Sequence, residues 1–236
     1  MSKIQLYMAP GTCARVSCIA LEEAGADFET VVMRFMKGEH KSPEFRQLNP
    51  KGKVPTLVID GEPLTENVAI ITYLDQRYPD AKLIPQAKNE LDGARQLADL
   101  CFCSTTLHPI VTRIRMAHFI AGEECAGAVW ATACKAMVEY FALIESRLSD
   151  QAWWYGDQWS AMDAYLYWVF WRVKGAEFDV SPFPRFAKHA QRMETRPAVQ
   201  RALAREAEAV KRLESEGLNF VPPSPSGFTG TGARRK

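Results

Sequence analysis

The residue with the most evident chemistry near the start of the chain is Cys13, in the stretch MAPGTCARVSCIAL. It follows a short apolar run and a Pro-Gly turn, and the residues after it have the apolar spacing of a helix. A thiol at the mouth of a helix faces free N–H groups and the positive end of the helix dipole, which stabilise the thiolate. We therefore expect a lowered pKa and a reactive Cys13, the alternative being a small buried residue. Cys18, one turn later, fits that alternative better.

Val54-Pro55, within NPKGKVPTL, is a second candidate for a functional site. A proline is tolerated at the head of a strand, because the N–H that it lacks is not needed there for the hydrogen bonds of the sheet. If the peptide bond before Pro55 is cis, the N–H and C=O of Val54 turn outward. There they could pair with an extended peptide ligand as an added strand. The alternative is an ordinary turn proline before an edge strand.

Thr65, Glu66 and Asn67 stand where a strand gives way to a helix, in LTENVAI. The free N–H groups of a helix N-terminus suit a ligand carboxylate, and Glu66 could hold a ligand ammonium group at the same time. Taken alone, the pattern is better explained by an ordinary N-cap with a favourable acidic residue in the first turn.

Composition and charge argue against several other classes of function. A net charge of +1 provides no basic surface for nucleic acid. The six cysteines form no CxxC pair and the four histidines have no ligand spacing, which argues against a metal site and a disulfide framework. The N-terminus has no secretory signal, and the most apolar later stretch, AYLYWVFW, is too short to span a bilayer. We expect a cytoplasmic protein with no metal, nucleic-acid or membrane partner.

The elements that must position these residues alternate between strand and helix signals over the first eighty residues. Strands are expected over 4–8, 27–33, 54–60 and 62–65. Helices are expected over 14–25 and 66–78, with a short helical turn over 41–50 that has Ser42 as its N-cap. The order β-α-β-α-β-β-α predicts a small α/β sheet domain over residues 1–80.

After residues 81–88, which form a proline-bearing linker, the strand signals stop. Helical periodicity extends over 89–122, 124–149 and 155–175, and over 184–214 with a break at Pro197. Ser160 and Asp163 have the spacing of a capping box, and the aromatic residues from Trp159 to Trp171 are expected in the core. An all-helical domain is therefore expected over 89–218. Residues 219–236, rich in Pro, Gly and Ser, are expected to form a mobile tail.

The motifs NPKGKVP, LTENVAI and GDQWSAMDAYL, taken together, resemble the cytosolic glutathione transferases over roughly residues 3–215. PGTCARVSCIALEEAG is most similar to the bacterial beta class, whose cysteine in that loop matches Cys13, and KGEHKSPEFRQLNPKGKVP is also similar to the theta class. The resemblance implies an α+β protein with a thioredoxin-like N-terminal domain and an all-helical C-terminal domain. It also implies a homodimer that conjugates glutathione, as co-substrate, to small hydrophobic electrophiles.

The resemblance implies a set of glutathione-binding residues. The Val54 backbone would pair with the cysteinyl backbone of glutathione, and Pro55 would be the cis-proline. Glu66 and Asn67 would hold the γ-glutamyl end, although the family more often has Ser or Gly at the second position. The glycine carboxylate would be met by theta-type contacts from His40 and Lys53, and Lys37 matches a beta-type contact.

The resemblance also implies catalytic residues, namely Cys13, His108 and Thr12. Gly11 stands where theta members place their serine, so Thr12 is the nearest hydroxyl. His108 matches the beta-class histidine and could donate a hydrogen bond toward the sulfur. Pro109 replaces the lysine that follows it, which removes a cation and distorts the helix.

The electrophile pocket is expected between the domains, with five candidate lining residues: Met8, Ala9, Ile110, Arg113 and Ile114. Two alternatives to conjugation stay open. One is a glutathione-dependent reductase, lyase or peroxidase that cycles through a mixed disulfide at Cys13. The other is a binding or regulatory protein without activity, against which the presence of Val54-Pro55, Glu66 and Asn67 argues.

Overall fold

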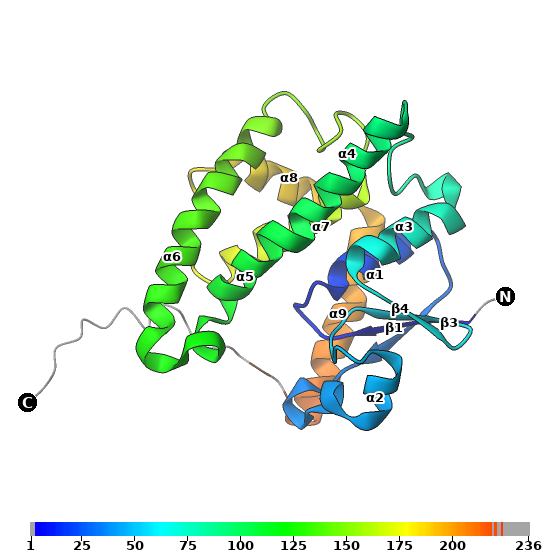
Figure 1. Ribbon diagram of the computed structural model, residues 1–236, viewed down its shortest axis with the longest axis vertical. Coiled ribbons are helices and arrows are strands. Elements are labelled where there is room, and N and C mark those ends of the chain that lie inside the picture. The colour runs from blue at the N-terminus through cyan, green and yellow to red at the C-terminus, as the bar shows by residue number, and fades with distance from the viewer. Residues whose placement is uncertain (1–2, 219, 221–222, 224–236) are drawn as a thin grey trace, which may run out of the picture.

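A computed structural model of the chain describes residues 3–218, Phe220 and Pro223. The segment expected to be a mobile tail, 219–236, lies outside the described residues apart from these two. The described chain consists of a sheet domain followed by a helical domain (Figure 1). The expected α+β architecture is therefore present.

A mixed sheet of four strands forms the centre of the first domain. The strands are β1 (Ile4–Met8), β2 (Glu29–Val32), β3 (Thr56–Ile59) and β4 (Glu62–Thr65), in the order β2-β1-β3-β4. The pair β1–β2 is parallel because α1 (Ala14–Glu23) carries the chain across, whereas β3 and β4 form an antiparallel hairpin. Asp60 and Gly61 join the hairpin with positive φ angles of 52° and 94°, the backbone that a two-residue hairpin turn requires.

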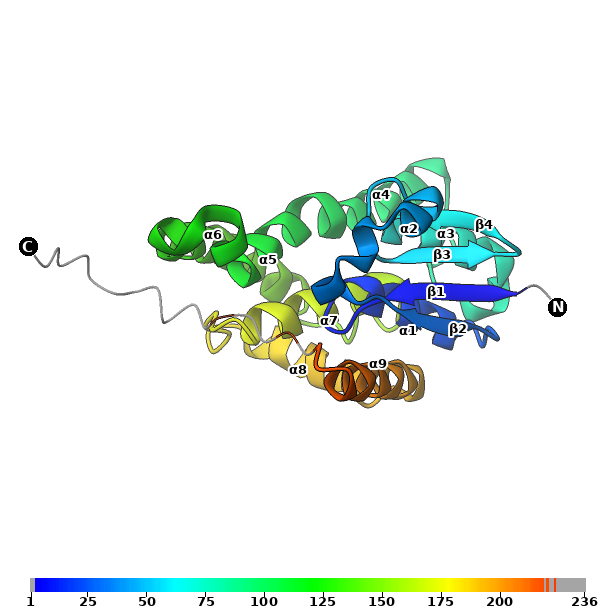
Figure 2. The same cartoon turned by 90° about the horizontal axis from the view of Figure 1, so that it is seen from below.

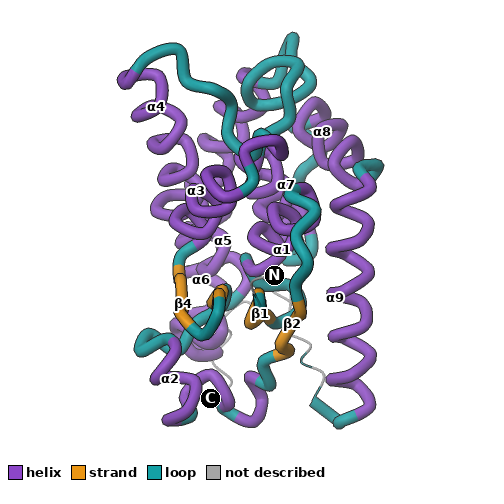
Figure 3. Tube along the Cα trace, turned by 90° about the vertical axis from the view of Figure 1, so that its right-hand side faces the viewer, coloured by secondary structure: helices purple, strands orange, loops and turns teal. Residues whose placement is uncertain are grey.

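Helices cover both faces of this sheet. The helices α1 and α3 (Asn67–Arg77) lie on the face toward the helical domain, and α2 (Pro43–Leu48) lies on the other face (Figures 1 and 3). Ser42 caps α2 as expected, since its hydroxyl accepts the N–H of Phe45 at 3.2 Å. Short 3-10 turns follow β2 at Phe35–Lys37 and Glu39–Lys41, and another, Pro79–Ala81, follows α3.

The helical domain begins with a helix that changes its winding. The helix α4 (Glu90–Cys101) continues into a π-helical segment (Phe102–Leu107) and then into α5 (His108–Arg115). The π segment immediately precedes Pro109, which has no N–H to donate to the carbonyl of Thr105 four residues earlier. The helix distortion expected at Pro109 is therefore present. Residues in and next to this distorted segment form part of one wall of the site described below.

The later helices are α6 (Ala117–Arg147), α7 (Ala161–Lys174), α8 (Pro184–Glu194) and α9 (Pro197–Ser215). The expected boundary between helices 89–122 and 124–149 is wrong by several residues, because α5 ends at Arg115 and α6 already starts at Ala117. Gly122 breaks the start of α6 with a φ of 70° and a ψ of 171°. Residues 161–170 of α7 are all buried, so this helix is the core of the domain.

Helix α6 is long and apolar enough, by length and composition, to cross a membrane, and among the described residues no other helix meets that test. Its most apolar stretch has a mean hydropathy of 1.2, and 22% of that stretch is buried. The stretch AYLYWVFW lies in α7. Core helices of soluble proteins satisfy the same criterion, so length and composition alone do not assign α6 to a bilayer.

The predicted capping box of α7 is confirmed and does more than cap a helix. Asp163 Oδ2 accepts hydrogen bonds from the Ser160 N–H at 2.9 Å and the Ser160 hydroxyl at 3.1 Å. Its Oδ1 accepts the Trp154 N–H and contacts His189 Nε2 at 2.9 Å. This fully buried carboxylate thus joins α7, α8 and the preceding loop.

The last helix returns to the sheet domain. Helix α9 lies along α1 on the side of β2 (Figure 2). Ion pairs join the two helices: Glu22 with Arg201 and Arg205, and Glu23 with Arg196. The C-terminal end of the helical domain therefore holds the first helix of the sheet domain in place.

Candidate functional site

A cleft of about 300 Å³ lies where the sheet domain meets the helical domain. Nine lining residues belong to the sheet domain: Cys13, Asn49, Lys53, Val54, Pro55, Thr65, Glu66, Asn67 and Val68. Four belong to the helical domain: Cys101, Ser104, His108 and Tyr165. Most of the residues expected to bind glutathione, and two of the three expected catalytic residues, therefore surround one space.

The Val54-Pro55 segment forms one edge of this cleft. The peptide bond before Pro55 is cis, as predicted. The buried Asn49 side chain holds the segment, since its amide donates to the Lys53 carbonyl at 2.7 Å and to the Thr56 hydroxyl at 3.0 Å. The sequence analysis did not select Asn49, although its position directly before Pro50 is a turn signal.

Glu66 occupies the N-cap of α3 with a φ of 74°, a backbone that non-glycine residues rarely adopt. Its carboxylate is exposed and pairs with Lys51 Nζ at 2.5 Å, and the same ammonium donates to the Thr65 hydroxyl at 2.8 Å. An ion pair this exposed contributes roughly 0–1 kcal/mol. A ligand ammonium group can therefore displace Lys51 at little cost.

Cys13 is the N-cap residue of α1, the position expected, but its environment is not the expected one. Its side chain makes no hydrogen bond to the helix N–H groups, and the thiol donates instead to the Val54 carbonyl at 3.7 Å. Burial raises the pKa of Cys13 to about 12, outweighing the lowering effect of the Asn67 amide. The predicted lowering of the pKa is wrong, because the residue is only 8% exposed and the thiolate would lose its hydration. Cys18 is buried in the core as expected.

His108 lies at the start of α5 and lines the cleft with Cys13. Its Nδ1 is 3.2 Å from the Tyr165 hydroxyl, and its ring meets the Trp168 ring edge to face at 4.7 Å. Burial, followed by the charge of Lys53, lowers the pKa of His108 to about 4. The imidazole is therefore neutral near pH 7, able to donate one N–H.

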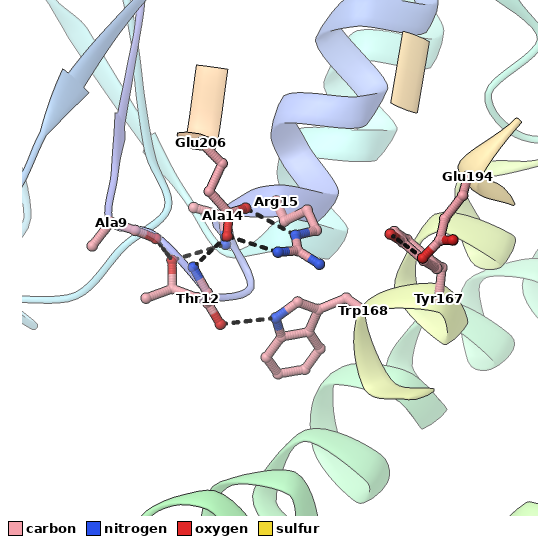
Figure 4. Close-up of polar contacts among 9 residues, drawn as sticks. Ala9, Thr12, Ala14, Arg15, Tyr167, Trp168, Glu194 and Glu206 are labelled. Atoms are coloured by element: carbon pink, nitrogen blue, oxygen red, sulfur yellow. Dashed lines mark hydrogen bonds and ion pairs between the residues drawn. The ribbon is translucent and has the colours of Figure 1, made fainter. Parts of the chain in front are cut away.

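Thr12, the third expected catalytic residue, does not line the cleft. Its hydroxyl donates to the Ala9 carbonyl at 2.7 Å and accepts the Ala14 N–H at 3.4 Å, contacts within its own loop (Figure 4). The expected donation from Thr12 to a bound sulfur is not supported, because its proton is already used by the backbone of the turn.

The loop before Cys13 is held from two helices. Glu206 of α9 accepts the Gly11 N–H at 2.7 Å and forms a two-point pair with Arg15, at 2.7 and 2.9 Å (Figure 4). On the other side, Trp168 of α7 donates its indole N–H to the Gly11 carbonyl at 3.3 Å. No local pattern predicts these contacts with Glu206 and Trp168, because the bonded residues lie at least 157 positions apart.

The three residues expected to contact the glycine carboxylate of glutathione do not all lie at the cleft. Lys53 lines the cleft, whereas the exposed Lys37 and the half-buried His40 do not. The His40 ring packs edge-on against Phe35 at 4.6 Å, and its buried Nδ1 has no hydrogen-bond partner among the residues that the structure describes.

The structure does not bring the five expected pocket residues to the cleft. Met8, Ala9, Ile110 and Ile114 are buried in the core, and Arg113 is exposed elsewhere on α5. On α5 the apolar side chains face the core, whereas His108 faces the cleft. The helical spacing of Ile110 and Ile114 therefore indicates the core face of this helix and not a face that lines the cleft. Residues that line the cleft and were not selected include Ser104, Cys101 and Tyr165. Tyr165 had been grouped with the aromatic core.

Within the described residues, no group of three or more His, Cys, Asp and Glu side chains is arranged to hold a metal ion. The polar atoms that line the cleft belong to amide, hydroxyl, carboxylate, ammonium, thiol and imidazole groups. They provide donors and acceptors for a polar, charged ligand.

Comparison with known proteins identifies the family. The chain matches the glutathione S-transferase N-terminal domain over residues 2–76 and the glutathione S-transferase C-terminal domain over residues 127–192. It is 32% identical over 205 residues to glutathione S-transferase GstA of Escherichia coli O157:H7, covering 86% of this chain and 98% of that protein. It is 27% identical over 205 residues to maleylacetoacetate isomerase of Pseudomonas aeruginosa, covering 85% and 94%. A solved sphingomonad glutathione S-transferase complexed with glutathione has a TM-score of 0.75 and 32% identity, over 86% of this chain and 98% of that one. The chain is therefore an enzyme of the glutathione S-transferase family.

Proposed function

We propose that this enzyme binds glutathione in the cleft and joins its sulfur to small hydrophobic electrophiles. The observation that carries the proposal is the grouping of a backbone edge at Val54, a carboxylate at Glu66 and an ammonium at Lys53 around one space of about 300 Å³. These three groups complement the peptide backbone, the amino group and a carboxylate of glutathione. His108 adds a neutral donor on the opposite wall.

In this proposal Glu66 exchanges Lys51 for the α-ammonium of glutathione, and Lys53 pairs with the glycine carboxylate. Asn67 has a different role from the one expected, because its side chain is already committed to Ser17 and Cys13. The free backbone N–H groups of the first turn of α3 are the donors for the γ-glutamyl carboxylate.

Conjugation requires a thiolate of glutathione, formed when the thiol proton leaves to water. Its lone pair forms the new carbon–sulfur bond, and with an aryl halide the carbon–halogen bond breaks and halide ion leaves. The neutral His108 imidazole stabilises that sulfur by donating its N–H. Cys13 does not act as a nucleophile, because with a pKa of about 12 its thiol stays protonated near neutral pH. This argues for conjugation over a mixed disulfide at Cys13.

One observation favours the alternative of thiol exchange: Cys101 lines the same cleft and is less buried than Cys13. A thiol in that position could attack a glutathione mixed disulfide. The relative from Pseudomonas aeruginosa, named an isomerase, adds glutathione-dependent isomerisation to the reactions to be assayed.

We also propose that the enzyme forms a homodimer in the cytoplasm. Leu91 and Leu97 on α4 and Val138 and Leu143 on α6 are exposed apolar side chains that a second copy could cover. All six cysteines are free thiols, which fits a reducing compartment. Light scattering of the wild type should give the mass of two chains, and Leu97→Glu should shift it toward one chain if α4 forms the interface.

Isothermal titration with glutathione, followed by a conjugation assay with a nitro-substituted aryl halide, tests the central proposal. We expect one glutathione site per chain and formation of the thioether. Saturable binding without thioether formation, together with reduction of a glutathione mixed disulfide, would favour thiol exchange. An absence of glutathione binding would overturn the proposal.

A further inference from the structure

The floor of the cleft rests on a chain of buried hydrogen bonds within the sheet domain. It starts at Ser17 on α1, whose hydroxyl donates to Asn67 Oδ1 at 2.6 Å. The Asn67 Nδ2 group donates to the Cys13 carbonyl at 3.0 Å. Both side chains are buried, so these bonds are protected from water.

The orientation of the Asn67 amide follows from its partners. A backbone carbonyl can only accept a hydrogen bond, so the side-chain NH₂ must face Cys13 and the oxygen must face Ser17. Burial raises the pKa of Tyr165 well above its usual value, and the Asn67 amide lowers it only in part. Tyr165 is therefore a protonated phenol near neutral pH, with one O–H to donate.

The buried Tyr165 hydroxyl carries one proton, which needs an acceptor. His108 Nδ1 lies 3.2 Å away, and no other acceptor in the described part of the chain hydrogen-bonds this hydroxyl. Tyr165 is 1% exposed, so a hydroxyl that donated to nothing would be costly. The balance of donors and acceptors therefore directs the phenol proton to Nδ1.

A neutral imidazole carries one proton, and an Nδ1 that accepts a hydrogen bond leaves that proton on Nε2. His108 Nε2 has no hydrogen-bond partner among the residues that the structure describes, and the ring lines the cleft. The N–H that is not used by the protein is thus available to a ligand in the cleft.

We propose that Tyr165 is a positioning residue that holds His108 as the Nε2–H tautomer and so presents an N–H to the sulfur of bound glutathione. This inference rests on the proposed function for the identity of the ligand. The tautomer itself is a property of the free enzyme, and it can be measured without any ligand.

The chain offers a matched control two residues along the same helix. The Tyr167 hydroxyl donates to Glu194 at 3.3 Å, on the far side of Trp168 from the Gly11 loop (Figure 4). Tyr165→Phe and Tyr167→Phe each remove one hydroxyl from a buried ring on α7, but only the first removes the partner of His108.

The deciding experiment is ¹⁵N NMR of histidine-labelled enzyme without ligand, in which the shifts of Nδ1 and Nε2 distinguish the two tautomers. His108→Gln identifies the His108 signals. We expect the Nε2–H form in the wild type and in Tyr167→Phe, and a shift toward the Nδ1–H form or a mixture in Tyr165→Phe. An Nδ1–H form in the wild type, or an unchanged tautomer in folded Tyr165→Phe, would overturn the inference. If Tyr165→Phe does not fold, the wild-type spectrum alone decides.

A kinetic measurement adds the consequence for the reaction. We expect Tyr165→Phe to lower kcat for conjugation roughly tenfold, the effect of one hydrogen bond, with the KM for glutathione within about twofold and Tyr167→Phe unchanged. An equal loss in both variants would show a merely structural effect and contradict the positioning role. If the wild type has the Nε2–H tautomer but binds no glutathione, the proposed function fails while the assignment of the tautomer stands.

Discussion

The two walls of the cleft are held in place by different means. On the sheet-domain wall, Val54, Pro55 and Glu66 are placed by backbone geometry: a cis peptide bond and a helix N-cap with a positive φ. On the helical wall, His108 and Tyr165 are placed by the packing of α5 and α7, and their hydroxyl-to-imidazole contact is made between residues 57 positions apart. The sheet-domain wall offers the groups proposed to bind glutathione. The helical wall offers the His108 N–H, the hydrogen-bond donor proposed to act in the reaction.

This difference teaches that binding and chemistry at this site depend on different parts of the fold. The charged binding groups, Glu66 and Lys53, are exposed and locally determined, so changing them should affect affinity with little effect on stability. The groups behind the Cys13 loop and on the helical wall are buried or half-buried and depend on partners far away in the sequence. Changing them should affect stability and chemistry together.

The largest effect is expected from breaking the support behind the Cys13 loop with Glu206→Gln. This change leaves the Arg15 guanidinium, 3% exposed, without its carboxylate partner. Removing one partner of a buried ion pair costs about 3–5 kcal/mol. Urea unfolding of the variant measures the loss. Glu208→Gln, at an exposed position of the same helix, should change stability by less than about 0.5 kcal/mol. Equal stabilities of the two variants would contradict the support role of Glu206.

A change on the sheet-domain wall should weaken glutathione binding and have little effect on stability. Glu66→Gln removes the carboxylate proposed to hold the glutathione ammonium, and a hydrogen bond to a charged group contributes about 1.5–3 kcal/mol. We expect the Kd for glutathione to rise roughly 10- to 100-fold while the free energy of unfolding changes by less than about 1 kcal/mol. Titration calorimetry and urea unfolding measure the two quantities. Glu62→Gln, an exposed residue of β4 that does not line the cleft, is the control and should bind as the wild type does.

The helical wall should add a pH dependence to stability. The pKa of His108 is about 4 in the folded enzyme and 6.5 for the ordinary group, so the unfolded state takes up the proton first as the pH falls. The stabilisation is therefore fully present above pH 6.5 and is lost toward pH 4, by roughly 2 kcal/mol between pH 7 and pH 5. The neighbouring charges are those of Lys53, Glu66 and Arg172, of which Lys53 has the largest effect. Urea unfolding of His108→Asn should lack this part of the pH dependence, and equal profiles would contradict the assignment.

The smallest effect concerns the reactivity of the two most different thiols. Cys125 is exposed, whereas burial raises the pKa of Cys13 to about 12. Because the thiolate is the reacting form, iodoacetamide at pH 8 should label Cys125 quickly and leave Cys13 largely unmodified in the folded enzyme. Peptide mass spectrometry after short labelling measures both sites, with urea-unfolded enzyme as the reference in which both react. Preferential labelling of folded Cys13 would show that its pKa is low.

The same contrast explains what could be predicted from the sequence. Pro55, Glu66 and the Ser160–Asp163 capping box depend on neighbours within a few positions, and the motifs around them identified the fold and the sheet-domain wall correctly. Tyr165 and the Glu206 clamp on Gly11 depend on contacts between distant helices, which leave no local pattern. Ile110 and Ile114 were misplaced because periodicity shows which face of a helix is apolar but not whether that face meets a pocket or the core.

The direction in which the pKa of Cys13 is shifted could also not be predicted from the neighbouring residues in the sequence. Its position at the N-cap of α1 was correct, and that position favours a thiolate. Burial, which no local pattern reveals, reverses the direction of the shift.

The most direct test of the account compares glutathione conjugation by Cys13→Ala and His108→Asn at saturating glutathione. If the protonated Cys13 thiol plays no chemical part and His108 supplies the donor to the sulfur, Cys13→Ala should keep kcat within about threefold of the wild type. His108→Asn should then lose roughly 10- to 100-fold in kcat, the effect of removing a donor to a developing thiolate. Loss of activity in Cys13→Ala with activity retained in His108→Asn would contradict the account.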